Sequence, residues 1–489
     1  MVMQMTMRLV RLWLWCAVVV VAVLCLGGCK EDGSAQAGDG ALVMATDAAF
    51  FPYEYVEDGE VVGLDVDMAR EMGRRMGVAV RVENMEFDSV IAAVQAGKVD
   101  FAASGITVSA DREKQVNFTR PYAVAQQVVL VSVGSALQRP QDLQGVRVGV
   151  QSGTTGDLYV KEHFGEPERY SNGPMAVAAL KAGKVDAVVL DDLPAKEHAA
   201  RNPGLQVLAE PLTREAYAVA VGKDKPELLA RMNEALAAME QDGTLARLAA
   251  DYAQRELPQE GQGMWGAFYH NFVKDGRWRY LADGLVVTVE ISAAAALIGI
   301  VLGALIGVVR STAEQTGRLR CLDFFCRLYL TVVRGTPVVV QLLIIYFVIF
   351  GSVEVSKVLV AIVAFGLNSA AYVAEIVRSG IMAVDRGQME AGRSLGLGYG
   401  YTMRAVVMPQ AFKNVLPALG NEFIVLLKET SICGYIALQD LTKGGNIILS
   451  QTYDAFLPLM AVALIYLLMV VGLSALLRKL ERRLKKNER

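Results

Sequence analysis

An arginine near a predicted helix start is the first residue of this sequence with an evident chemical use. Arg112 falls in the first turn of a helix whose N-cap is expected to be Ser109, where the helix dipole disfavours a cation. A placement that costs stability indicates a role for the side chain. The planar guanidinium can hold a carboxylate through two parallel hydrogen bonds, which a lysine ammonium cannot do. The alternative is a solvent-exposed surface arginine.

Hydroxyl residues and glycines after two predicted strands can complete an anion site. In both places a strand leads into a helix, where backbone N–H groups are free to face an anion. The second stretch is expected to close over the anion from a separate lobe. The residues concerned are Ser104, Gly105 and Thr107 after the first strand, and Gln151, Thr154 and Thr155 after the second.

Composition and spacing exclude several other chemistries. The net charge of −3, with basic residues clustered only near the C-terminus, gives no basis for nucleic-acid binding. The three histidines, at 163, 198 and 270, are not spaced as metal ligands. Ser152 lies in Gly149-Val150-Gln151-Ser152-Gly153, which lacks the spacing of a hydrolase nucleophile elbow. Neither a metal site nor catalysis is expected.

The elements that must position these residues follow an α/β pattern. Short apolar strands alternate with helical segments over residues 38–258, which predicts parallel strands with helical crossovers. The phrase Ala-Gly-Lys-Val-Asp at 96–100 recurs at 182–186, each time with glycine where a helix would end. The repeat predicts two similar lobes with a ligand cleft between them, unless it is a coincidence of a common turn. Segments 127–133 and 216–221 are expected to cross between the lobes as a hinge.

Four phrases of this unit together resemble the polar amino-acid family of periplasmic binding proteins. They are Ala45-Thr46-Asp47-Ala48-Ala49-Phe50, Val62-Gly63-Leu64-Asp65-Val66-Asp67, Gly105-Ile106-Thr107 with Arg112, and Gln151-Ser152-Gly153-Thr154-Thr155. Each phrase alone has low specificity, whereas their order along the chain is specific. The resemblance covers the whole unit and implies a two-lobed α/β domain that closes around an amino acid.

The resemblance also implies which residues contact the ligand. Arg112 would hold the α-carboxylate, and Asp192 the α-ammonium. Asp47 would face the ligand side chain beside the rings of Phe50 and Phe87. The full expected set is Asp47, Phe50, Phe87, Ser104, Gly105, Thr107, Arg112, Gln151, Thr154, Thr155 and Asp192. A neutral aliphatic ligand would leave Asp47 unpaired. Because glutamine binders tend to have lysine and histidine where this chain has Gln151 and Asp191, glutamine and basic amino acids both stay open.

Residues 1–29 predict a secretory signal. Arg8 and Arg11 precede an apolar run from Leu12 to Leu26, which is shorter than a full membrane span. The run ends in Leu26-Gly27-Gly28-Cys29, which is similar to a bacterial lipobox and makes Cys29 the candidate for lipidation. The alternative is ordinary cleavage after Ala37, which exports the same domain.

A membrane domain is predicted at 283–489, after a linker and interfacial helix at 259–282. Arginines and lysines gather in alternate loops and in the C-terminal tail, while the other loops carry only Lys357 and Lys443. By the positive-inside rule, the C-terminus is cytoplasmic and the binding domain periplasmic, in a bacterial inner membrane. Five all-α spans are expected, at about 284–309, 328–350, 357–377, 417–437 and 455–477.

One loop of the membrane domain carries a specific motif. Glu390-Ala391-Gly392, Gly396 and Pro409 are spaced as in the coupling loop of ABC importer permeases, which this loop resembles. A short helix would lie in a cleft of the ATPase, with Gly396 permitting the turn and Pro409 starting the return segment. Phrases such as Arg334-Gly335-Thr336-Pro337 are similar to the amino-acid branch of histidine/glutamine-type permeases.

Three charged residues are expected at membrane depth, namely Glu422, Lys428 and Glu429. Such residues are costly in a bilayer unless they face the helix bundle or a wet cavity. They are candidates for the translocation path, or else pair with one another and fix helix packing.

The expected function is that of a transport subunit and not of an enzyme. No GxxxxGK[ST] phosphate loop occurs in the sequence. ATP and Mg would therefore be used by a separate ABC ATPase, and this chain would need no cofactor. A single coupling loop implies a second permease copy, in a homodimer or a heterodimer. The main rival is a ligand-gated channel, in which the pore would interrupt the binding domain. An exported enzyme on the same fold would leave the coupling motif unexplained.

Overall fold

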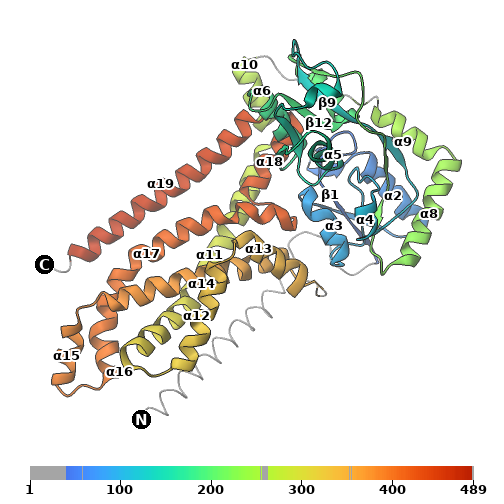
Figure 1. Cartoon of the computed structure of the whole chain (residues 1–489). Helices are drawn as coiled ribbons and strands as arrows, with labels where there is room; N and C mark the ends of the chain where they lie inside the picture. Colours follow the sequence, from blue (N-terminus) through green and yellow to red (C-terminus); the bar gives the residue numbers. More distant parts are fainter. Residues whose placement is uncertain are drawn as a thin grey trace.

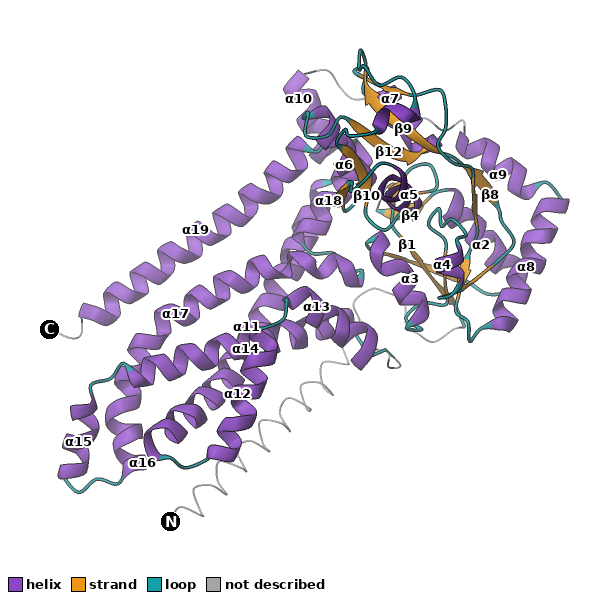
Figure 2. Cartoon of the chain, viewed as in Figure 1, coloured by secondary structure: helices purple, strands orange, loops and turns teal. Residues whose placement is uncertain are grey.

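The computed structural model of the chain describes residues 40–57, 59–253, 255, 263–351, 353 and 355–486. Figure 1 shows two parts, an α/β domain at one end and a bundle of long helices, and Figure 2 shows that the strands are confined to the first part. The signal segment and lipidation predicted for residues 1–29, and residues 259–262 of the predicted linker, lie outside the described residues.

The first lobe of the α/β domain is built on a five-stranded sheet. Its strands are β1 (Leu42–Thr46), β5 (Val80–Asn84), β6 (Phe101–Ala102), β7 (Asn117–Phe118) and β15 (Ala220–Val221). Its helices are α2 (Leu64–Met76), α3 (Phe87–Gln95), α4 (Ala110–Glu113), α8 (Pro226–Gln241) and α9 (Thr244–Ala253). The strand order is β5-β1-β6-β15-β7, with β1 parallel to β5 and β6 and β15 antiparallel to its neighbours. Met72 and Phe101 are buried in its core.

The second lobe repeats this plan. Its strands are β9 (Gln127–Ser132), β10 (Val148–Gln151), β11 (Glu168–Tyr170), β12 (Ala187–Asp191) and β13 (Leu205–Val207). Its helices are α5 (Thr155–His163), α6 (Gly173–Lys181) and α7 (Asp192–Arg201). The order β11-β10-β12-β9-β13 again has two parallel pairs and a strand that returns antiparallel. Gly97 and Gly183, from the repeated phrase, both have left-handed φ angles, of 66° and 68°. The two-lobed α/β prediction is confirmed.

A two-stranded ribbon connects the lobes. It pairs β8 (Ala123–Ala125) with β14 (Glu215–Tyr217), antiparallel. The predicted hinge strand at 127–133 is wrong, because that segment is β9 and lies in the sheet of the second lobe. Apolar character alone could not separate a buried core strand from a crossing strand.

The helical domain contains long helices joined by shorter ones. They are α10 (Gly263–Phe268), α11 (Trp278–Thr316), α12 (Arg320–Arg334), α13 (Val338–Leu343), α14 (Lys357–Met382), α15 (Arg386–Ser394), α16 (Tyr399–Thr402), α17 (Met408–Glu429), α18 (Leu441–Thr452) and α19 (Phe456–Lys486). Within the described residues α11, α14 and α19 are long and apolar enough to cross a membrane. The chain is therefore a multi-pass membrane protein.

Two predicted helices differ from the structure. The expected span at 328–350 is broken, because α12 and the helix at 338–349 are bent by 105° around Gly335-Thr336-Pro337. Counted as one span, this pair gives a fourth crossing. The interfacial helix expected within 259–282 is interrupted as well, since Asp275 and Gly276 have positive φ angles and α11 begins only at Trp278. The proline accounts for the first break, since it cannot donate a helical hydrogen bond.

Small residues allow α11 and α14 to approach closely. A Cβ atom on Gly303 would lie 2.6 Å from Val373 Cβ, and one on Gly307 would lie 2.7 Å from the Ala374 backbone oxygen. Gly299 faces Ser369 in the same way. Glycines four residues apart form one stripe on a helix, which is a common contact surface between membrane helices.

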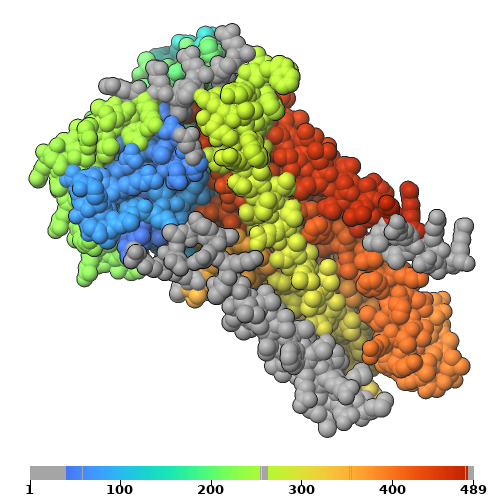
Figure 3. Space-filling view, turned by 180° about the vertical axis from the view of Figure 1, so that it is seen from behind, coloured from blue at the N-terminus to red at the C-terminus, as the bar shows by residue number. Residues whose placement is uncertain are grey.

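The α/β domain packs directly on the helical domain, as Figure 3 shows from behind. The contact is made by α18 and by a small sheet of the first lobe, formed by β2 (Ala49–Phe50), β3 (Glu54–Glu57) and β4 (Glu60–Val62). Gln451 Nε2 donates to the Val56 carbonyl at 2.8 Å. Figure 1 shows α15 and α16 at the opposite end of the helices.

Candidate functional site

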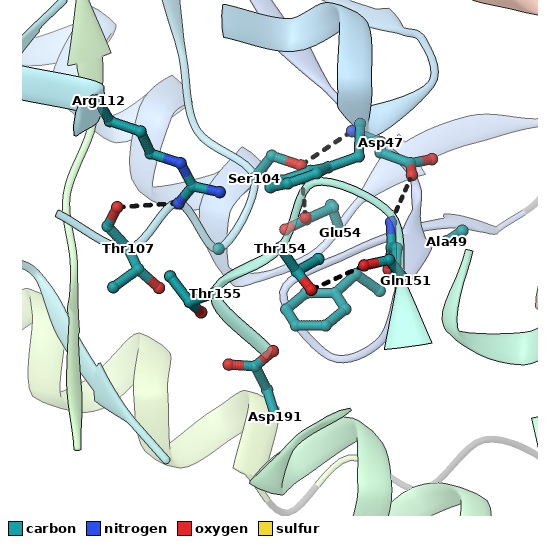
Figure 4. A pocket seen from close by; sticks show the side chains of 13 residues that line it. Asp47, Ala49, Glu54, Ser104, Thr107, Arg112, Gln151, Thr154, Thr155 and Asp191 are labelled. Atoms are coloured by element: carbon teal, nitrogen blue, oxygen red, sulfur yellow. Dashed lines mark hydrogen bonds between the residues drawn. The ribbon is translucent and has the colours of Figure 1, made fainter. Parts of the chain in front are cut away.

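A cavity lies between the two lobes of the α/β domain (Figure 4). It contains about 390 Å³ of unfilled space, part of which is continuous with solvent. Ten of the eleven ligand residues predicted from the sequence line it. The lining residues are Asp47, Ala49, Phe50, Glu54, Phe87, Ser104, Gly105, Thr107, Arg112, Gln151, Thr154, Thr155 and Asp191.

Arg112 is held in place by backbone groups of both lobes. Ser109 caps α4 and its hydroxyl accepts from the Arg112 N–H, which confirms the predicted N-cap. The guanidinium donates to the carbonyl oxygens of Thr107 at 2.9 Å and of Gly153, in the second lobe, at 3.1 Å. Its carbon lies 5.5 Å from the centre of the Phe87 ring. These contacts orient the guanidinium plane for a carboxylate in the cavity.

Thr107 and Thr155 meet at a third residue that sequence reasoning did not single out. Their hydroxyl groups donate to Glu215 Oε2, at 2.6 Å and 2.7 Å. Thr107 belongs to the first lobe, Thr155 to the second, and Glu215 to the connecting strand β14. The three side chains hold the lobes together at the hinge side of the cavity.

Asp47 is buried at the opposite side of the cavity from the hinge threonines. Its carboxylate accepts from Gln151 Nε2 of the second lobe at 3.3 Å, and its backbone N–H donates to Ser104 Oγ at 3.0 Å. Burial raises the pKa of Asp47 to about 7, partly offset by the nearby Lys443 ammonium. A cation placed in the cavity would stabilise the carboxylate and lower this pKa.

Glu54 and Asp191 are acids of the cavity that were not in the predicted set. Ser104 Oγ donates to Glu54 Oε1 at 2.8 Å, and burial beside Asp65 raises the pKa of Glu54 well above its ordinary value. Asp191 accepts from Gln127 Nε2 at 2.9 Å and from the Tyr217 hydroxyl. Burial raises the pKa of Asp191 to about 7. Glu54 therefore holds its proton more tightly than an ordinary glutamate, while Asp47 and Asp191 titrate near pH 7.

The structure differs from the sequence prediction at Asp192. That residue begins α7, and its carboxylate pairs with Lys196 Nζ at 2.8 Å, one helical turn further on. Asp191 is the last residue of β12 and lines the cavity instead. The sequence contains two adjacent acids here, Asp191 and Asp192. Because β12 ends at Asp191, it is Asp191 that faces the cleft.

The segment with the predicted coupling motif is a helical hairpin far from this cavity. Asp385 caps α15, Glu390 and Ala391 are exposed on that helix, and Gly396 turns the chain with a φ angle of 80°. Gly392 is buried against α16. A side chain would not fit there, because a Cβ atom on Gly392 would lie 2.4 Å from Thr402 Cγ2. Pro409 stands in the first turn of α17, where its missing N–H leaves no helical bond unmade.

Two known families divide the chain between them. Residues 42–255 match the family described as bacterial extracellular solute-binding proteins, family 3, and residues 280–486 match the binding-protein-dependent transport system inner membrane component. The chain is 38% identical over 211 residues to the arginine transport system permease protein ArtQ of Bacillus subtilis, covering 43% of this chain and 94% of that protein. This chain belongs to the binding-protein-dependent transport permeases. It carries its solute-binding domain in the same polypeptide.

Other similar proteins belong to the same two groups. The glutamine transport system permease protein GlnP of Escherichia coli is 36% identical over 208 residues, covering 42% of this chain and 93% of that protein. Among solved structures, an ancestral arginine-binding protein bound to glutamine is 36% identical, covers 44% of this chain and 97% of that chain, and has a TM-score of 0.42. Both families are transport components and not enzymes.

The permease domain holds the three predicted path residues in different environments. Glu422 accepts from Ser369 Oγ at 2.9 Å, and Glu429 accepts from Asn368 Nδ2 at 3.3 Å. Both acids therefore face α14, inside the helix bundle. Lys428 lies on the exposed side of α17.

Proposed function

We propose that this chain captures a basic amino acid outside the inner membrane and passes it through its permease domain, in an ATP-driven ABC importer. The arrangement of charge in the cavity carries the proposal. Arg112 is the basic residue among its lining residues, whereas Asp47 and Asp191 are two acids that ionise near neutral pH. A basic amino acid brings one carboxylate and two cationic groups, so that Arg112, Asp47 and Asp191 would each face an opposite charge of the ligand.

The proposed pose follows from where these charges lie. Arg112 and the N–H groups at the start of α5 receive the α-carboxylate, because the guanidinium fork and a helix N-terminus both favour an anion. Asp191 receives the α-ammonium, and Asp47 receives the side-chain cation. Phe50 and Phe87 line the path between them and contact the aliphatic part of the ligand.

Glutamine fits this charge pattern less well. Its amide can donate to Asp47 but brings no side-chain charge, so Lys443 of the permease domain, 4.0 Å away, would be the cation left beside that buried carboxylate. Relatives named for arginine and for glutamine both occur. The acids of this cavity favour arginine or lysine.

The two ends of the molecule would face opposite sides of the membrane in the transport cycle. The binding domain would lie in the periplasm, and α15–α16, which lie at the other end, would dock on a separate cytoplasmic ATPase that uses ATP and Mg. The positive-inside distribution of arginine and lysine supports this orientation and a cytoplasmic C-terminus. The proposal takes α17 (Met408–Glu429), which overlaps the span expected at 417–437, as the fifth crossing. A second permease copy would supply the second coupling helix.

A ligand panel tests the proposal. The full-length chain in lipid nanodiscs would be titrated with L-arginine, L-lysine, L-glutamine, L-citrulline and L-leucine. Citrulline has nearly the shape of arginine without its charge, so we expect arginine to bind at least about tenfold more tightly, a difference of about 1.4 kcal/mol. Equal affinity for arginine and citrulline would contradict the basic preference. Binding of none of the five would contradict the site itself.

A further inference from the structure

A helix of the permease domain places a buried lysine next to Asp47, an acid that lines the ligand cavity. Asp440 caps α18, and its carboxylate accepts from the Lys443 N–H at 3.0 Å. Ile447, one turn further on, joins Ala48 and Val56 of the first lobe in an apolar cluster. The helix is therefore fixed on the binding domain, with Lys443 directed at it.

The ammonium of Lys443 contacts a carboxylate that also faces the ligand space. Nζ lies 2.9 Å from Glu86 Oε1 and 4.0 Å from Asp47 Oδ1. The exposed fractions of the three side chains are only 8%, 11% and 5%, in the order Lys443, Glu86 and Asp47. Asp47 lines the cavity on its other side. Asp47 thus lies between the ligand and a cation of the permease.

We propose that Lys443 promotes the release of a cationic ligand by competing for Asp47 when the binding domain is docked on the permease. The inference rests on the proposed function, because it requires a ligand with a cationic group at Asp47. Two cations that share one buried carboxylate repel each other more strongly than they would in water. Docking would therefore weaken the hold of the cavity on the ligand.

Glu86 stabilises the buried ammonium of Lys443 when no ligand is bound. A buried ammonium without a partner is strongly unfavourable. The 2.9 Å contact with Glu86 keeps Lys443 paired whether or not Asp47 is engaged by a ligand. Glu86 itself precedes Phe87 at the start of α3 and does not line the cavity.

A second ion pair between the domains offers a matched control. Lys357, at the start of α14, lies 2.5 Å from Glu83 of the first lobe. Glu83 does not line the cavity, so this pair contributes to docking without touching the ligand space. Lys357→Gln and Lys443→Gln each remove one interdomain cation, and the glutamine can still donate a hydrogen bond to its acid.

The test measures equilibrium binding of radiolabelled L-arginine and L-citrulline to the full-length chain in nanodiscs. We expect Lys443→Gln to bind arginine about tenfold more tightly than wild type, while its affinity for citrulline changes less than about twofold. Lys357→Gln should show neither change. In proteoliposomes with the partner ATPase, Lys443→Gln should import arginine more slowly than wild type.

The outcomes separate this inference from the proposed function. If wild type binds arginine and Lys443→Gln binds it equally well, the release role is wrong and the proposed function stands. If Lys443→Gln binds arginine and citrulline more tightly by the same factor, the effect is not charge competition, and the inference is again wrong. If the wild-type chain binds no arginine, both fail together.

Discussion

Titration of Asp47 should make ligand binding at the proposed site depend on pH. Its pKa of about 7 is raised by burial and by the neighbouring acids Glu86 and Asp88, and is held down by Lys443. A cationic ligand binds the ionised form, so binding releases a proton when the pH lies below this value. The affinity for arginine should therefore be full above about pH 8 and fall as the pH drops through 7.

This prediction is checked by titrating L-arginine into the full-length chain at about pH 6 and about pH 8, where a single carboxylate of pKa near 7 predicts a change of about tenfold. Asp191, whose pKa is also about 7, adds to the slope. The neutral side chain of L-citrulline should make its binding less dependent on pH. Equal slopes for the two ligands would show that no side-chain cation meets a titrating acid.

Asp191 and Asp192 can be separated by matched substitutions. Asp191 is buried at the cavity, so Asp191→Asn should weaken arginine binding at least about tenfold through the loss of a charged hydrogen bond worth ~1.5–3 kcal/mol. Asp192→Asn removes a partner of the exposed Lys196, a type of pair that contributes little. Its binding should change less than about twofold. A larger loss for Asp192→Asn would restore the placement implied by family resemblance.

At the scale of single residues, the sequence could predict those side chains that follow directly from a strand end or helix start. Arg112 with its Ser109 cap is one such case, and Thr154 at the start of α5 is another. Glu54 could not be predicted in the same way. It comes from β3 of a small separate sheet and reaches the cavity only through a tertiary contact with Ser104.

At the scale of elements, the lobes were predictable because each contains the same helix, glycine turn and strand. The span at 328–350 was not, because apolar length says nothing about a bend of 105°. The signal for this bend is Pro337, because a proline inside an apolar run favours a broken helix. The glycines at 299, 303 and 307 are a further signal, since such spacing favours close packing between membrane helices.

The contact between α11 and α14 gives a prediction at this scale. In Gly303→Ala the new methyl group would lie 2.6 Å from Val373 Cβ and 2.8 Å from the Ala370 carbonyl oxygen, which belongs to the backbone. We expect a loss of about 1–3 kcal/mol from overpacking. Gly472→Ala in α19 is the control, since no atom of the described part of the chain lies within 4 Å of its Cβ position. Thermal unfolding of the full-length chain in detergent should show a lower midpoint for the first variant alone.

The helix α15 gives a second prediction. Glu390 is exposed on it, at the end of the permease domain away from the binding domain. Glu390→Lys should uncouple ATP hydrolysis from import in the reconstituted importer, because a reversed charge at a docking surface repels its partner. Arginine binding should stay unchanged. The control is Glu227→Lys, a charge reversal at an exposed position of α8, and import at the wild-type rate by the Glu390 variant would refute the coupling role.

At the scale of the whole molecule, the docked arrangement could not be derived from the sequence. Lys443 is separated from Glu86 by 357 positions, and Gln451 from Val56 by 395. Contacts of this kind leave no local pattern. What the sequence does establish is that the two domains share one chain, which gives the binding domain a high effective concentration at the permease.

The permease touches both lobes of the binding domain at once. Lys443 and Gln451 contact the first lobe, whereas Tyr453, at the end of the same helix, contacts α7 of the second. The Arg201 guanidinium lies 4.7 Å from the centre of the Tyr453 ring, and the His198 ring meets it edge-on at 4.6 Å. One helix can therefore sense the relative position of the lobes, because only one lobe arrangement satisfies both sets of contacts.

Loss of the Tyr453 ring should therefore uncouple lobe closure from the ATPase while leaving the ligand cavity intact. In Tyr453→Ala the contacts to His198 and Arg201 disappear, and we expect arginine to stimulate ATP hydrolysis several-fold less in the reconstituted importer, in line with the ~0.5–2 kcal/mol of a cation–π contact. The affinity for arginine should change little, since Tyr453 does not line the cavity. Tyr453→Phe keeps the ring and should behave as wild type. Full stimulation in Tyr453→Ala would mean that the permease senses closure through the first lobe.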